Sequence, residues 1–174
     1  MKVILSFLCL ALVLTFYNNI KNQHLSSEMK KKIFATNSLS HQGQSLDSLS
    51  CQSQSKCLIV YMAPWCPACL QFKSQLFPEF LKTIISKKEE KNIGLKIIIG
   101  RDSLDKVQKM GASLGQTYTE DSSGKYYNDL GIKGVPAFLV LRSDGKIIKN
   151  VSGFRARGNN LAQASENFFK ELVP

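Results

Sequence analysis

The stretch that decides the fold reads LIVYMAPWCPAC (residues 58–69), a short apolar run followed directly by two cysteines three positions apart. Residues 58–62 (LIVYM) are apolar and rich in β-forming side chains, which is typical of a buried strand. The next three residues (APW) interrupt this run, and a helical pattern begins near Cys66. The sequence therefore predicts a strand, a turn and a helix whose first turn carries Cys66 and Cys69.

The placement of these two cysteines predicts redox chemistry. Unpaired backbone N–H groups and the helix dipole favour negative charge at a helix N-terminus, so we expect Cys66 to react as the thiolate. Cys69 lies deeper in the helix and should stay protonated longer. Pro67 costs no hydrogen bond in the first turn. We therefore expect Cys66 to attack a disulfide and Cys69 to resolve the mixed disulfide, without a cofactor.

The same C-x-x-C spacing also occurs in zinc sites, which need a second pair of ligands. Cys51 and Cys57 are separated by five residues, looser than the usual ligand spacing, and His24 and His41 lie in a polar segment. The context of a strand before the pair and a helix after it favours redox chemistry, so we expect no metal ligands.

The rest of the chain alternates predicted strands and helices. Strands are expected at residues 95–99, 137–141 and 146–151, the last two joined by a Ser-Asp-Gly turn. A first helix is expected from Cys66 to the charged cluster 87–91, with a kink at Pro78. Further helices are expected at 104–114, at 126–130 and at 161–172, the last capped by Asn159 or Asn160, and 117–125 is expected to be a loop. The apolar helix faces include Leu70 and Leu161. This order predicts an α/β domain with a central mixed β-sheet flanked by helices on both faces.

The N-terminus carries a targeting pattern. Met1-Lys2 precedes an uncharged, mostly apolar segment that extends to residue 20, which fits a secretory signal or an N-terminal membrane anchor. The absence of an A-x-A-like cleavage site favours the anchor, whereas lysines beyond the segment disfavour it. We therefore divide the chain into a signal peptide or anchor (1–20), a polar lead-in (21–50) and a folded domain (51–174).

Composition limits the partners. Lys and Arg outnumber Asp and Glu by 23 to 13, for a formal net charge of +10. This balance favours anionic partners such as a membrane surface or acidic client proteins. The basic residues are scattered and lack an accompanying cluster of base-stacking aromatics, so no nucleic-acid partner is expected.

Four of the five cysteines lie outside the apolar N-terminal segment, which suits an exported protein in an oxidising compartment. Besides Cys66 and Cys69, these are Cys51 and Cys57. The two interpretations of this candidate second disulfide are a structural bridge between the lead-in and the first strand, and a redox pair that exchanges with Cys66–Cys69. Spacing alone leaves both open.

The motif WCPAC (65–69) after an apolar strand resembles the active site of thioredoxin-like proteins, and GVPAF (134–138) looks like their cis-proline loop. The resemblance covers roughly residues 57–173. It implies a thioredoxin-like fold in which Pro136 is cis and lies beside Cys66, with the Val135 backbone free to pair with a client peptide. By this resemblance, active-site support and client binding involve Trp65, Pro67, Ala68, Val135 and Pro136.

Within that superfamily the chain is similar to the exported TlpA/ResA-like reductases, on residues 121–125, 131–136, 138–140 and 144–146 and on the extra helical segment 104–114. Those relatives typically have a membrane anchor and keep protein thiols reduced outside the cytoplasm. The resemblance implies protein clients and a membrane-bound or soluble redox partner that recharges the cysteine pair. One departure is Val60, at the position where thioredoxins carry a buried Asp or Glu that aids proton transfer.

The direction of electron flow is the least determined property. Pro67-Ala68 lacks the His that helps stabilise a thiolate in strongly oxidising relatives, which favours a reductase. The alternatives are a disulfide oxidase or isomerase of the DsbA type, and a non-enzymatic metal-binding module that has kept the fold.

Overall fold

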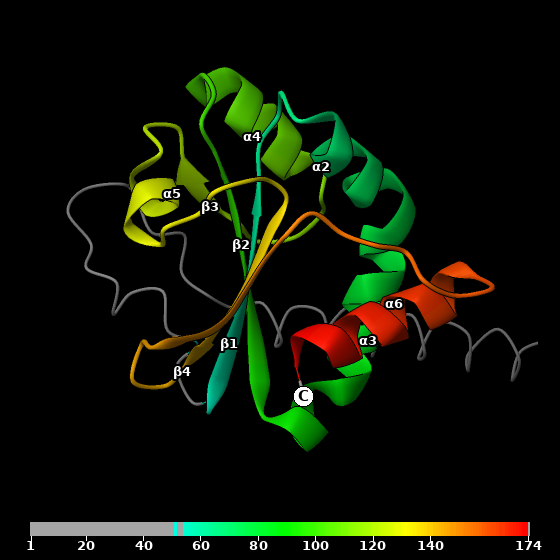
Figure 1. The fold of residues 1–174 in the computed structure, drawn as a ribbon. Coiled ribbons are helices and arrows are strands. Elements are labelled where there is room, and N and C mark those ends of the chain that lie inside the picture. Colours follow the sequence, from blue (N-terminus) through cyan, green and yellow to red (C-terminus); the bar gives the residue numbers. More distant parts are fainter. Residues whose placement is uncertain (1–50, 52–53, 174) are drawn as a thin grey trace, which may run out of the picture. The chain divides into compact units, whose positions relative to one another are not determined.

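The computed structural model describes Cys51 and residues 54–173, and the predicted segments 1–20 and 21–50 lie outside these residues. The elements are β1 (Lys56–Met62), α2 (Pro67–Gln71), the π-helix η2 (Phe72–Leu76), α3 (Phe77–Lys91), β2 (Ile93–Gly100), α4 (Leu104–Ala112), β3 (Thr119–Asp121), α5 (Lys125–Asp129), β4 (Ala137–Arg142), β5 (Ile147–Ser152) and α6 (Leu161–Leu172). Figure 1 shows them along the chain. No helix among the described residues is long and apolar enough to cross a membrane.

The strands form one mixed sheet in the order β3-β2-β1-β4-β5. β1 runs parallel to β2, and β2 runs parallel to β3, whereas β4 is antiparallel to both β1 and β5. β1 is therefore the central strand, and six of its seven residues are buried, as the apolar run 58–62 predicts. The parallel strands β1, β2 and β3 all end at one edge of the sheet, which is where side chains from distant segments meet.

One face of the sheet is covered by α3 and α6, which lie side by side (Figure 1) and are joined by a 2.8 Å hydrogen bond between the Thr83 and Ser165 hydroxyls. The core on this face is aromatic. Phe138 of β4 packs edge-on against Phe72 at 5.1 Å and Phe168 at 4.7 Å between ring centroids. Edge-to-face pairs of this kind are favourable beyond their buried area, so they hold η2 and α6 firmly on the sheet.

The opposite face carries α5 (Figure 1). Alternate residues of β1 point to this face, so that Ile59 and Tyr61 form a buried cluster with Tyr126 and Leu130. The prediction of a mixed sheet with helices on both faces is therefore confirmed.

The structure differs from the predicted elements in three places. Thr119–Asp121 is a short parallel edge strand, whereas we expected a loop, because three polar residues carry no strand periodicity. The interruption expected at Pro78 is a π-helical turn just before it, so the chain passes from α2 through η2 to α3. Leu70 and Leu161, which lie near the starts of α2 and α6, expose 45% and 49% of their surface rather than facing the core.

The turn and cap predictions are confirmed. Gly145 in the β4–β5 turn has φ +78°, a conformation that glycine adopts without a steric penalty. Asn160 caps α6, since its side-chain oxygen accepts a 2.9 Å hydrogen bond from the Gln163 amide.

Candidate active site

Cys66 is the N-cap residue of α2. Its backbone is extended (φ −88°, ψ 113°), and Pro67 occupies the first turn. The Cys66 sulfur accepts a 3.1 Å hydrogen bond from the Cys69 amide, one of the amides that a helix N-terminus leaves unpaired. The predicted strand–turn–helix arrangement around the cysteine pair is therefore present, with the first sulfur at the start of the helix.

The two thiols differ in access to solvent. Both are free in the structure; Cys66 exposes 4% of its surface and Cys69 none. Burial, with a smaller contribution from the hydrogen bond with Cys66, raises the pKa of the Cys69 thiol above its usual range. Cys69 is thus the protonated, enclosed member of the pair.

The Val135–Pro136 peptide bond is cis, as the resemblance to thioredoxin-like proteins implied. The Cys66 thiol donates a 3.4 Å hydrogen bond to the Val135 carbonyl, which places the loop directly beside the reactive sulfur. β4 begins at Ala137, paired with Tyr61 of β1, so sheet registry brings the loop to the end of β1. Pro136 is buried, whereas Pro67 and Ala68 are exposed at the start of α2.

Trp65 directly precedes the pair in the sequence. Its side chain exposes 54% of its surface, yet Nε1–H donates a 2.7 Å hydrogen bond to the backbone carbonyl of Arg101, just after β2. Arg101 was not among the residues predicted for the site. A main-chain acceptor 36 positions away leaves no signal in a sequence motif, since any residue type supplies a carbonyl.

Val60 is fully buried in β1, paired with Phe138 of β4. The position at which thioredoxins carry an acid is therefore apolar in its surroundings as well as in its side chain. The buried acid of this domain is Asp121, at the end of β3. It accepts a 2.8 Å hydrogen bond from the Tyr61 hydroxyl, and Tyr61 follows Val60 and so points to the opposite face of the sheet.

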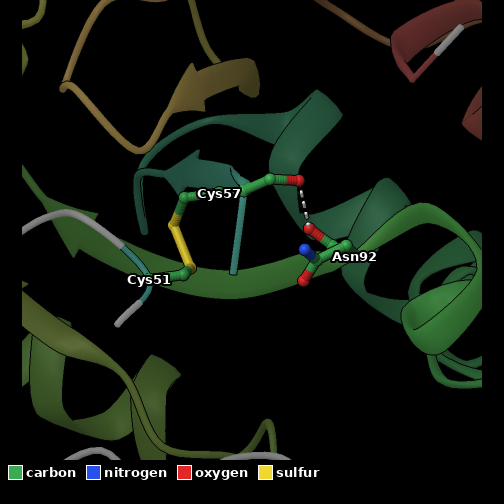
Figure 2. The surroundings of a disulfide bond; sticks show 4 residues. Cys51, Cys57 and Asn92 are labelled. Atoms are coloured by element: carbon green, nitrogen blue, oxygen red, sulfur yellow. Dashed lines mark hydrogen bonds between the residues drawn. A yellow bond between two sulfur atoms is a disulfide. The ribbon is translucent and has the colours of Figure 1, made fainter. Parts of the chain in front are cut away.

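Cys51 and Cys57 form a disulfide, with Cα atoms 5.1 Å apart (Figure 2). Cys57 pairs with Gly94 of β2, and a Cβ added at Gly94 would lie only 2.5 Å from Cys51 Cβ and 2.6 Å from its sulfur. Glycine at position 94 therefore makes room for the disulfide against the sheet.

The two cysteine pairs lie at opposite ends of β1. Cys57 is near its start and Cys66 follows its end, and five extended residues span about 17 Å. Thiol–disulfide exchange requires a sulfur to attack another directly. In this structure the Cys51–Cys57 disulfide therefore lies too far from the Cys66–Cys69 pair for direct attack. Of the two interpretations left open by the sequence, the structural bridge fits this geometry, and the role of the disulfide stays a prediction.

The spacing of Cys66 and Cys69 also occurs in metal sites. Within the described part of the chain, no group of three or more His, Cys, Asp or Glu side chains is arranged to hold a metal ion. His24 and His41 lie outside the described residues.

Residues 49–168 match the family described as the thioredoxin-like domain. The chain belongs to the thioredoxin-like family. The match spans most of the chain and includes the cysteine pair and the cis-proline loop, so the superfamily inferred from WCPAC and GVPAF is confirmed. A comparison with curated proteins found no match.

Solved structures of this family share the fold. A candidate thiol:disulfide interchange protein DsbE from Chlorobium tepidum is 21% identical, with a TM-score of 0.52 over 70% of this chain and 82% of that one. A secreted disulfide oxidoreductase of Mycobacterium tuberculosis, described as homologous to E. coli DsbE, is 19% identical (TM-score 0.49; 69% and 86% covered). StoA from Bacillus subtilis is 18% identical (TM-score 0.46; 67% and 84%). At such identities the likeness concerns the thioredoxin-like fold.

Proposed function

We propose that this chain is a thiol–disulfide oxidoreductase that exchanges disulfides with protein clients through Cys66 and Cys69. The observation that carries the proposal is the unequal exposure of the two free thiols at the start of α2. A client can reach only Cys66, and Cys69 is held one helical turn behind it. This division of a reachable and an enclosed thiol is what a two-step exchange requires.

In the first step, the Cys66 thiolate attacks one sulfur of a client disulfide. A Cys66–client mixed disulfide forms, and the second client sulfur leaves as a thiolate. In the second step, the Cys69 sulfur attacks Cys66 Sγ, the Cys66–Cys69 disulfide forms, and the client leaves as a dithiol. The client gains two electrons and the cysteine pair loses them, so a separate redox partner must reduce the pair before the next cycle.

Position 60 is a valine, so no carboxylate there accepts the proton that Cys69 loses. Burial raises the pKa of Cys69, so the thiol must lose its proton during the attack rather than before it. The client thiolate released in the first step is a base beside the pair, and we assign it the role of proton acceptor, directly or through water, as the new Cys66–Cys69 bond forms. This route makes resolution slower than in relatives with a buried acid.

The loop beside Cys66 supplies the client-binding edge in this proposal. The Val135 carbonyl contacts the Cys66 thiol in the free protein. A client peptide that lies along residues 134–136 would bring its own disulfide to the same sulfur. Trp65 directly precedes Cys66 and is more than half exposed, so in this proposal it supplies an aromatic wall for the client.

We propose an exported location and net reduction of clients. The signal-like or anchor-like segment 1–20 supports export, as does the Cys51–Cys57 disulfide, because such bonds persist mainly in oxidising compartments. The reducing direction rests on Pro67-Ala68, which lacks a His between the cysteines. Equilibrating the pair with glutathione tests the direction: a potential of about −120 mV would identify a DsbA-like oxidase instead.

The function itself is tested by trapping. In a Cys69→Ala variant the second step is blocked, so Cys66 should accumulate in mixed disulfides with client proteins. The Cys66→Ala/Cys69→Ala double variant is the matched control and should accumulate none. Equal recovery from both variants, together with stoichiometric metal bound to the wild-type protein, would favour the non-enzymatic metal-binding module.

A further inference from the structure

The Trp65 indole is held by a hydrogen bond although most of its surface is exposed. An indole with more than half of its surface in solvent would ordinarily sample several rotamers. Here its N–H group is bound to the Arg101 carbonyl at 2.7 Å. Because Trp65 directly precedes Cys66, this bond determines which surface stands beside the reactive sulfur.

Arg101 holds its carbonyl in place through an unusual backbone conformation. Its φ is +56°, in the left-handed region that residues other than glycine seldom adopt. Two contacts stabilise the residue there: its amide donates a 3.0 Å hydrogen bond to the Asp121 carbonyl, and its guanidinium lies 4.2 Å above the centre of the Tyr127 ring.

Asp121 anchors this arrangement from the core. Its side chain is fully buried, and its carboxylate accepts hydrogen bonds from the Tyr61 hydroxyl (2.8 Å) and from the amides of Tyr126 and Tyr127 (3.1 Å each). A buried carboxylate needs such partners to offset its desolvation. Gly100 leaves the space for this contact, since a Cβ there would overlap Asp121 and the Tyr61 hydroxyl.

We propose that Arg101 and Asp121 are positioning residues for Trp65: Asp121 fixes the left-handed Arg101 peptide, and the Arg101 carbonyl fixes the indole beside Cys66. These contacts connect Asp121 at the end of β3, Arg101 after β2 and Trp65 after β1. Its purpose, presenting a fixed aromatic wall to a client, rests on the function proposed above. The geometric claim can be tested without that function.

The test uses the full-length chain in detergent micelles and follows the indole N–H of Trp65, the only tryptophan in the sequence, by two-dimensional ¹⁵N NMR. Arg101→Gly and Arg101→Pro form a matched pair. Both lack the guanidinium, but glycine adopts positive φ freely, whereas proline is confined to about −65° and has no amide proton for Asp121.

In Arg101→Gly we expect the indole proton to exchange with solvent at a rate within about threefold of wild type. In Arg101→Pro we expect exchange at least about tenfold faster than in wild type, because losing about 1.4 kcal/mol of hydrogen-bond energy corresponds to a factor of ten. Equal exchange in wild type and Arg101→Pro would overturn the proposal. So would loss of protection in Arg101→Gly, because the side chain would then be the determinant.

If Arg101→Pro does not fold, Asp121→Asn answers the same question. Its amide group keeps the volume but has one acceptor oxygen instead of two, so it cannot satisfy the Tyr61 hydroxyl and both α5 amides. We expect a folded protein with intermediate indole protection. Full wild-type protection in Asp121→Asn would overturn the role of Asp121.

A kinetic measurement separates positioning from the proposed function. With a peptide disulfide as substrate, Arg101→Pro should raise KM severalfold relative to Arg101→Gly. Both variants should react at equal rates with a small aromatic disulfide, which is too small to need the contact with Trp65. Equal KM values for the peptide would overturn the role in client binding. A wild-type protein inactive toward both substrates would remove the proposed function, and the NMR result would still decide the geometry.

Discussion

At the residue scale, the environment of Cys69 differs strongly from that of a free side chain. It is fully buried, and its pKa is raised by that burial. Cys66 lies three positions earlier, its sulfur accepts a hydrogen bond from the Cys69 amide, and it keeps a small exposed surface. Two identical side chains therefore acquire different roles from one turn of helix.

The raised pKa predicts how the stability of the reduced protein depends on pH. A thiol whose pKa is higher in the folded than in the unfolded state holds its proton longer when folded, so stability is complete below the unfolded pKa and falls as pH rises above it. The decline should begin near pH 8.5, at up to about 1.4 kcal/mol per pH unit for one proton. Urea titrations of reduced wild type and reduced Cys69→Ala between pH 7 and 10 check this expectation.

Cys69→Ala removes this titration, whereas Tyr61, whose pKa burial also raises, is present in both proteins. The wild type should therefore lose stability faster than the variant as pH rises. Parallel curves would mean that Cys69 has the same proton affinity in the folded and unfolded chains.

Val60 offers a second prediction at this scale. Val60→Asp would place a carboxylate where thioredoxins carry one, and should shorten the lifetime of the Cys66–client mixed disulfide by supplying a proton acceptor. The same change should cost about 3 kcal/mol or more of stability, because it buries a polar group among apolar ones. Quenched-flow measurement of the mixed disulfide checks the rate.

Val60→Asn is the matched control, with similar volume and polarity but no basic carboxylate. It should lose comparable stability without faster resolution. If Val60→Asn resolves the mixed disulfide as quickly as Val60→Asp, local loosening rather than proton transfer explains the effect.

At the element scale, the start of β1 and of β2 form one unit with the Cys51–Cys57 disulfide. The Asn92 carbonyl accepts hydrogen bonds from the Ser55 hydroxyl and the Lys56 amide, both 3.2 Å, which ties the start of β1 to the residue that follows α3. Figure 2 shows the disulfide together with a hydrogen bond to Asn92. Gly94 then gives the disulfide its space against β2.

Gly94→Ala should therefore destabilise the protein by about 1–3 kcal/mol, the usual cost of overpacking. Its Cβ would overlap the Cys51 side chain, so the backbone or the disulfide has to move. In a Cys51→Ala/Cys57→Ala background no disulfide holds residue 51 against β1, so the same substitution should cost less. Thermal unfolding of the four proteins gives this double-mutant cycle, and an additive result would show that residue 94 and the disulfide are independent.

At the scale of the whole domain, the disulfide and the cysteine pair occupy opposite ends of the central strand. The disulfide closes a short loop between positions six apart in the chain, which corresponds to about 2 kcal/mol in the loop-entropy model. Its contribution should therefore be to stability alone.

Cys51→Ala/Cys57→Ala should lower the free energy of unfolding by about 2 kcal/mol and leave the rate of peptide disulfide exchange within about twofold of wild type at 25 °C. Denaturant unfolding and stopped-flow exchange measure the two quantities. A large loss of exchange in a protein that remains folded would revive the interpretation of Cys51–Cys57 as a second redox pair.

The sequence by itself determined the strand, the turn and the helix around Cys66–Cys69, since neighbouring residues decide a buried apolar run, a proline-marked turn and a helix start. It also predicted the position of the cis-proline loop and the class of fold. Only the tertiary structure decided the rest: that Cys51 bonds Cys57 over Gly94, that Trp65 binds a carbonyl 36 positions away, and that Asp121 is buried against a tyrosine 60 positions away. The physical reason is that these contacts join backbone groups and isolated side chains from different strand ends, and no local periodicity records which strand ends will meet.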